Sequence, residues 1–160
     1  MDHQPISREG YDKIREQIRT FEDVDMPLII QKIADSRAEG DLSENAEYHG
    51  QREAQGLLKA RIDMLKTKLA NCYIVDKSTM PKGIVTFGSR VRVRDRDDGS
   101  EEQYEFVGPG EEDYSGEIMK ILTSSPLAKS LLGKKKGDSV ELSLPKRMQR
   151  LEIVEIIDDY

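Results

Sequence analysis

The chain has 160 residues, of which 35% are charged and 36% hydrophobic, and its formal net charge is −6 at pH 7. This charge argues against a general polyanion binder, because nonspecific affinity for nucleic acids comes mainly from Lys and Arg side chains on phosphates. The single Cys72 excludes an internal disulfide and a thiolate zinc cluster, and no apolar run approaches the ~20 residues of a membrane span. With no Trp and only three Phe, the composition favours a helical hairpin beside a small domain, in a soluble cytoplasmic protein.

The first segment, 7–39, has the periodicity of an amphipathic helix. Ser7 is a candidate N-cap, and apolar residues then recur at intervals of three and four at Tyr11, Ile14, Ile18 and Phe21. After Pro27 the pattern resumes in a shifted phase with Ile30, Ile33 and Arg37. Proline lacks a backbone N–H and disfavours helix at the preceding residue. We therefore predict a kink or short break at 25–27 within one continuing helix.

An acidic connection follows at 40–48. Gly40 can adopt the left-handed conformation that ends a helix, and Ser43 is a candidate cap for the next helix, with Glu44 and Glu47 in its first turn. Such a short connection forces two antiparallel helices.

Asp41 and Glu44 admit two interpretations. Acidic residues at the start of a helix are ordinary and stabilise the helix dipole. Alternatively, two carboxylates at an exposed tip can hold a divalent cation. Two oxygen ligands alone bind Mg²⁺ weakly, because this ion keeps several waters and usually shares its site with phosphates. A metal site here would therefore need another macromolecule to complete it.

The second segment, 44–73, carries the most regular heptad pattern of the chain, at Leu58, Ile62, Leu65, Leu69 and Cys72. We expect these residues to pack against the apolar positions of the first helix and form a coiled coil.

Arg37 and Arg52 lie near the acidic connection, on opposite helices. They either pair with acidic neighbours on their own helix, at Glu39, Glu47 or Glu53, or contact a phosphate backbone. His49 has no second His or Cys at metal-ligand spacing, so we interpret it as a surface residue.

The pattern changes after the linker 77–83, where residues alternate between apolar and polar as in β-strands. The alternating runs are 91–94, 103–107, 139–144 and 151–156, with 118–122 or 84–87 as further candidates. Residues 97–100 predict a hairpin turn. One short helix is predicted by Ser125 as N-cap, Pro126 at the first position and Gly133 past the end.

These patterns predict an α+β chain. Residues 1–76 form a long antiparallel helical hairpin, and residues 84–160 form an antiparallel sheet wrapped around one helix. The second domain carries no phosphate-binding glycine loop and no nucleophile elbow. We interpret it as a docking module.

The connection resembles the tip motif of the bacterial Gre transcript cleavage factors, most closely the GreA type. It reads Gly40-Asp41-Leu42-Ser43-Glu44-Asn45-Ala46-Glu47-Tyr48-His49. Supporting similarities cover nearly the whole chain and lie at Arg52-Glu53, Ile74-Val75-Asp76, Phe87-Gly88, Ser125–Ala128 and Leu131–Lys134.

The resemblance implies a function that spacing alone does not give. The second domain would have an FKBP-like fold and dock on the rim of the RNA polymerase secondary channel, through Ser125, Pro126, Leu127 and Leu131. The hairpin would reach the active site, where Asp41 and Glu44 help to hold a Mg²⁺ shared with polymerase. Arg37 and Arg52 would contact the extruded RNA 3′ end. The factor would bind no cofactor alone, act as a monomer away from membranes, and stimulate the polymerase's own RNA cleavage rather than be an enzyme.

Two departures and two alternatives remain. Pro145–Gln149 replaces the Pro-Gly type turn usual in the last hairpin, and Tyr114–Glu117 departs from the usual spacing before the helix. An inhibitory paralogue would occupy the same channel, but such proteins tend to have a more densely acidic tip. An FKBP-type isomerase or chaperone would need an aromatic-lined pocket, and residues 80–160 contain only two Phe and three Tyr.

Overall fold

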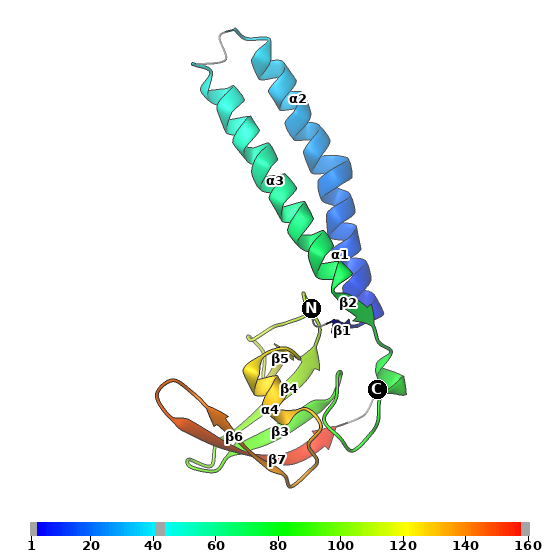
Figure 1. Cartoon of the computed structure of the whole chain (residues 1–160), viewed down its shortest axis with the longest axis vertical. Coiled ribbons are helices and arrows are strands. Elements are labelled where there is room, and N and C mark those ends of the chain that lie inside the picture. Colours follow the sequence, from blue (N-terminus) through cyan, green and yellow to red (C-terminus); the bar gives the residue numbers. More distant parts are fainter. Residues whose placement is uncertain (1–2, 41–43, 158–160) are drawn as a thin grey trace. The chain divides into compact units, whose positions relative to one another are not determined.

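The structure, a computed structural model, describes residues 3–40 and 44–157 (Figure 1). The fold is α+β, and the chain divides into two units, each described by itself. One unit is a helical hairpin, Tyr11–Asn71, and the other is a sheet unit that joins 3–10 with 72–157. Residues 3–10 and 72–76, which the sequence assigned to the hairpin, thus group with the sheet. No helix among the described residues is long and apolar enough to cross a membrane.

Two long helical arms build the hairpin. The first arm consists of α1 (Arg8–Thr20), a π-helical segment η1 (Phe21–Asp25) and α2 (Met26–Arg37). The second arm is α3 (Ala46–Ala70), and Figure 1 shows α2 and α3 running side by side. Ser7 caps α1 as predicted, since its Oγ accepts a hydrogen bond from the Gly10 N–H at 3.0 Å.

The buried seam of the hairpin changes phase at the π-helical segment. Half-buried Phe21 is followed on the buried face by Met26, five residues later, and the Met26 N–H bonds to the Phe21 carbonyl. One i→i+5 turn therefore shifts the seam by one residue. The predicted irregularity exists, but it lies at 21–25 rather than 25–27, and the helix continues through Pro27.

Two of the three residues predicted to continue the seam after Pro27, Ile30 and Arg37, are exposed. Ile30 is 51% exposed, whereas Ile33 and Ser36 are buried. On α3, Ile62 and Leu65 are buried as the heptad pattern predicted. Leu58 and Leu69 are half-buried, and Cys72 lies beyond the helix in a strand.

Polar groups also join the two arms beside the π-helical segment. The Arg61 guanidinium carbon lies 4.9 Å from the centroid of the Phe21 ring, a cation–π contact. Lys66 Nζ pairs with Glu22 Oε1 at 2.5 Å, and this hydrogen bond raises the pKa of Lys66. These two contacts from α3 therefore stabilise the first arm at the phase shift.

The sheet unit contains two sheets. Strand β1 (Gln4–Ile6) pairs in parallel with β2 (Cys72–Ile74). The larger sheet has the order β5-β4-β3-β7-β6. Its strands are β3 (Arg90–Asp95), β4 (Glu101–Val107), β5 (Ile118–Leu122), β6 (Ser139–Ser143) and β7 (Met148–Ile157).

An antiparallel sheet was predicted, but the larger sheet is mixed, with parallel and antiparallel pairs. β4 and β5 pair in parallel, because the loop between them returns the chain to the starting end of β4. The predicted turn at 97–100 joins β3 to β4, with Gly99 at φ 76° and the Asp98 carboxylate accepting from the Ser100 N–H at 2.8 Å. The candidate strand at 84–87 is a loop.

One short helix, α4 (Pro126–Leu131), packs against the core of the larger sheet. Ser125 caps it by accepting from the Ala128 N–H at 3.2 Å, and Gly133 follows it at φ 82°, both as predicted. The core gathers β-branched and aromatic residues of the strands around Ala128 and Leu131 of this helix. Its strand members include Val91, Val93, Tyr104, Phe106, Ile121, Val140, Leu151 and Ile153.

The N-terminal strand is held tightly within the sheet unit. Ile6 is 0% exposed, and its carbonyl accepts a hydrogen bond from the Val75 N–H at 2.9 Å. Gly108 lies so close to β1 that a Cβ there would stand 2.4 Å from the Pro5 carbonyl oxygen. The Glu111 carboxylate accepts hydrogen bonds from the Ser7 hydroxyl and the Gly108 N–H. β1 is therefore an integral part of this unit.

Candidate functional site

The acidic tip lies between the end of α2 and the start of α3. Asp41, one of the two predicted metal ligands, and Ser43, the predicted cap, lie outside the described residues. Glu44 is described, and its side chain is exposed. Gly40 has a φ of 127°, a positive value that glycine adopts readily, which supports its predicted role at the helix end.

The cap of α3 is Asn45 and not Ser43. Its Oδ1 accepts a hydrogen bond from the Tyr48 N–H at 3.0 Å, and its backbone carbonyl accepts from the His49 N–H at 3.1 Å. The helix therefore begins at Ala46, later than predicted. Glu44 precedes the helix, and only Glu47 falls in its first turn.

The two candidate RNA-contacting arginines are exposed. Arg37 is the last residue of α2. Arg52, on α3, donates from Nη1 to Gln55 Oε1 at 3.2 Å. Glu47 instead accepts from Gln51 Nε2 at 3.2 Å. Within 3–40 and 44–157, the structure shows no ion pair from either arginine to Glu39, Glu47 or Glu53, the partners considered from the sequence.

His49 lies at the surface, as predicted, in edge-to-face contact with Tyr48. Their ring centroids are 5.4 Å apart, with an angle of 67° between the planes. Among the described residues, no three His, Cys, Asp or Glu side chains lie together as a metal-ligand group. Glu44 offers the oxygen ligand that Mg²⁺ prefers, and it stands where a second macromolecule can reach it.

The four predicted docking residues have different environments. Leu131 is 0% exposed in the core, so the prediction that it contacts a partner is wrong. Leu127 packs against the same core, and the Ser125 hydroxyl caps α4. Of the four, Pro126 has an exposed side chain. A core leucine and a surface leucine of a short helix cannot be distinguished from the sequence, which explains the error.

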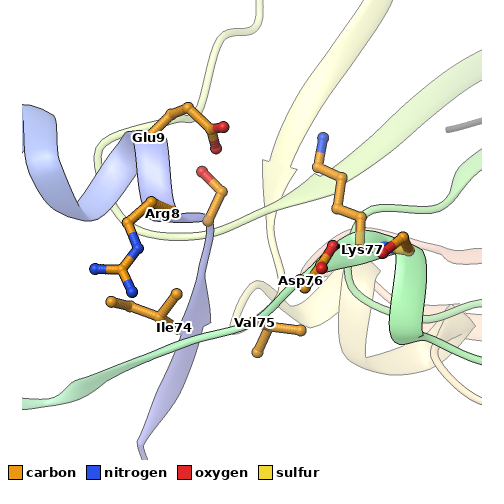
Figure 2. Close-up of a pocket in the computed structure, with 8 residues that line it drawn as sticks. Arg8, Glu9, Ile74, Val75, Asp76 and Lys77 are labelled. Carbon is orange, nitrogen blue, oxygen red and sulfur yellow. Dashed lines mark hydrogen bonds between the residues drawn. The ribbon is translucent and has the colours of Figure 1, made fainter.

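The sheet unit also has a cavity of about 640 Å³ that the sequence did not predict, where β1 meets the segment after β2. Figure 2 shows Arg8 and Ile74 on one side of it, and Asp76 and Lys77 on the other. Two of its charged side chains, Asp76 and Lys77, have partners within the unit. Asp76 accepts from the N–H and hydroxyl of Ser78, which lower the pKa of Asp76, and Lys77 Nζ lies 3.4 Å from Glu105 Oε1.

A second cavity, of about 520 Å³, is mainly apolar. It lies beside α4, and its aromatic residues are Tyr73 and Phe87. The hydroxyl–carboxylate pair of the first cavity, Ser78 and Asp76, has an acid whose pKa is lowered, which makes it a weak base. The tip of the hairpin is therefore the better candidate site.

The chain is similar to known proteins over nearly its whole length. A solved GreA/GreB transcription elongation factor from Nitrosomonas europaea is 25% identical, with 98% of each chain covered and a TM-score of 0.42. The transcription elongation factor GreA of Thermodesulfovibrio yellowstonii is 41% identical and covers 97% of both chains. That of Psychrobacter arcticus is 38% identical over 99% of this chain and 100% of its own. Sequence profiles for the "Transcription elongation factor, N-terminal" and "Transcription elongation factor, GreA/GreB, C-term" domains match residues 4–74 and 80–158. The chain therefore belongs to the GreA/GreB family of transcription elongation factors.

Proposed function

We propose that this chain rescues arrested transcription by stimulating RNA cleavage within RNA polymerase. The hairpin enters the polymerase secondary channel and brings its tip to the 3′ end of backtracked RNA. Membership of the GreA/GreB family and the tip motif at 40–49 support this assignment.

The observation that carries the proposal is the placement of Glu44. The ordinary roles of an acidic residue at a helix start are to cap the helix and to stabilise its dipole. Asn45 performs the capping of α3, and Glu44 is exposed just before it. Its carboxylate is therefore available to a ligand from outside the hairpin.

Asp41 and Glu44 are the residues that would hold a Mg²⁺ shared with polymerase. A carboxylate pair suits this ion but leaves most of its coordination positions to water, phosphate and other ligands. When bound, the ion would polarise the phosphodiester and stabilise the attacking oxygen. We expect the free factor to be inactive, because the remaining ligands belong to polymerase.

Arg37 and Arg52 are suited to hold the RNA. Both side chains are exposed on the helices that flank the tip. A guanidinium group remains charged and offers donors in a planar arrangement that matches phosphate. We propose that they contact the extruded RNA backbone next to the shared metal.

The sheet unit would dock on the channel rim, as an FKBP-like module of a monomeric factor. The segment Ser125–Pro126 fits this role best, because Pro126 is exposed while the helix behind it is anchored in the core. Leu131 contributes by fixing α4 and not by touching polymerase.

The test is a cleavage assay on a halted transcription complex with purified polymerase. Wild-type protein is expected to shorten the RNA in a Mg²⁺-dependent reaction, and Asp41→Ala and Glu44→Ala each to abolish this stimulation. Glu53→Ala removes an equal charge from an exposed position of α3 and should retain it. Rescue by the Asp41 and Glu44 variants at the wild-type rate would refute the proposal.

A further inference from the structure

A single side chain joins the two arms of the hairpin at the tip. Asn45 Nδ2 donates to the backbone carbonyl of Ser36 at 2.6 Å, while Asn45 Oδ1 accepts from the Tyr48 N–H at 3.0 Å. Ser36 lies in the last turn of α2, and Asn45 caps α3. One amide group thus bonds the end of one helix and the start of the next.

Both bonds satisfy groups that helix ends leave without intrahelical partners. The first N–H groups and the last carbonyl groups of an α-helix need partners from elsewhere. The Ser36 carbonyl accepts from the Glu39 N–H at 3.2 Å and uses its remaining capacity for Asn45. The Tyr48 N–H is one of the first-turn donors of α3.

These two partners explain why asparagine occupies this position. Asn, Asp and Ser are about equally good N-caps, so capping alone does not select among them. A carboxamide has a donor and an acceptor at fixed positions, whereas an ionised Asp only accepts. The N–H of Tyr48 requires the oxygen, and the carbonyl of Ser36 requires the nitrogen, so the orientation of the amide is determined.

Ser36 and Asn45, which this hydrogen bond joins, are immediate neighbours of two candidate functional residues. Arg37 directly follows Ser36, and Glu44 directly precedes Asn45. Ser36 is 2% exposed and Asn45 is half-buried, so both residues lie on the packed side of the hairpin. Arg37 and Glu44 are exposed one residue beyond them.

We propose that Asn45 is a positioning residue for the tip, whose bond to Ser36 holds Glu44 and Arg37 in the arrangement that RNA cleavage requires. It acts through these two neighbours and does not touch the metal or the RNA. The inference rests on the proposed function for its catalytic readout, but its structural readout needs no polymerase.

The discriminating variant is Asn45→Asp. It preserves an acceptor for the Tyr48 N–H, so α3 remains capped, but it replaces the donor to Ser36 with a carboxylate oxygen that repels the carbonyl. Asn45→Ala loses both bonds. Asn71→Asp makes the same chemical change at the other end of α3, where that residue is the C-cap, and serves as the matched control.

The first measurement is the backbone order of Arg37 and Glu44 in the free protein, by ¹⁵N relaxation. We expect Asn45→Asp to lower the order parameters of both residues while the Tyr48 N–H stays protected from exchange. The control should match wild type at the tip. Unchanged order in Asn45→Asp would overturn the proposal.

The second measurement is cleavage in the halted complex as a function of Mg²⁺ concentration. A misplacement of about 1 Å can cost ~10²-fold in rate, so Asn45→Asp should lose at least about tenfold in maximal rate. The half-saturating Mg²⁺ concentration should also rise, which a smaller folded fraction alone would not cause. Wild-type values for both the maximal rate and the half-saturating Mg²⁺ concentration in Asn45→Asp would overturn the proposal.

An inactive wild-type protein would instead refute the proposed function, and the measurement of backbone order would then decide the role of Asn45.

Discussion

Gly108→Ala should loosen the N-terminal strand from the sheet unit. A Cβ at this position would lie 2.4 Å from the Pro5 carbonyl oxygen and 2.8 Å from the Ile6 Cα. Both obstacles belong to the backbone, so no side-chain rotation relieves the overlap. Either β1 moves away or the loop after β4 does.

The size of the effect follows from what β1 buries. Overpacking of a well-packed site typically costs about 1–3 kcal/mol, and exposing a buried Ile side chain costs about 1.5–3 kcal/mol. If the overlap cost more than this exposure, β1 would detach instead. Because Ile6 is fully buried, the cost of the substitution is therefore limited to about 1.5–3 kcal/mol. We expect the free energy of unfolding to fall by about 2–3 kcal/mol in all, within these ranges.

Urea unfolding followed by NMR signals of the sheet core measures this change. Gly116→Ala is the matched control, because a Cβ there meets its nearest neighbour, the Ile118 carbonyl oxygen, at 3.4 Å. It should change the stability by less than about 0.5 kcal/mol, as surface substitutions usually do. A Gly108→Ala protein as stable as the control would refute the close approach of β1.

Two further predictions concern the hairpin and the turn at 97–100. Ile33→Ala should destabilise the hairpin by about 2–5 kcal/mol as a buried truncation, whereas Ile30→Ala, at an exposed position, should cost clearly less; equal losses in thermal unfolding would contradict the phase shift. Hydrogen bonds from the side chain and backbone of Ser100 lower the pKa of Asp98 in the folded protein. The stabilisation that they give is therefore fully present above the pKa of Asp in the unfolded chain, about 3.9. It is lost as the pH falls through the lower pKa of the folded protein. An NMR titration should show this depressed midpoint, and Ser100→Ala should raise it; an unchanged midpoint in that variant would exclude the hydroxyl as the main cause.

Features encoded by neighbouring residues were predictable from the sequence. The helix after Ser125 and the turn before Ser100 depend on caps, proline and glycine within a few positions. The heptad pattern likewise predicted the buried Ile62 and Leu65. In these places local preference and tertiary structure agree.

Features that depend on distant partners were not predictable. The parallel pairing of β1 with β2 joins very short segments far apart in the chain, and β4 and β5 could have paired in either direction. The change of phase comes from a π-helical turn at 21–25, before Pro27, and it places Ile33 and Ser36 rather than Ile30 on the buried face. Each of these outcomes depends on packing across the fold and not on local composition.

The candidate site was predicted in part. The motif identified Glu44, and the structure describes it as exposed. The cap was assigned to Ser43, because several residues of the tip are good caps and spacing does not choose among them. Asn45 was selected by a second bond to Ser36, across the connection, which no sequence pattern records.

The pairing of β1 with β2 makes the hairpin an insertion into the sheet unit. The chain leaves this unit after its first strand and rejoins it at a strand paired with the first, from Gln4 opposite Cys72 to Ile6 opposite Ile74. Adding or removing whole heptads in both arms would leave these partners unchanged. The hairpin can therefore become longer or shorter during evolution without changes in the sheet unit. Relatives with hairpins of different length would keep the same pairing of β1 with β2.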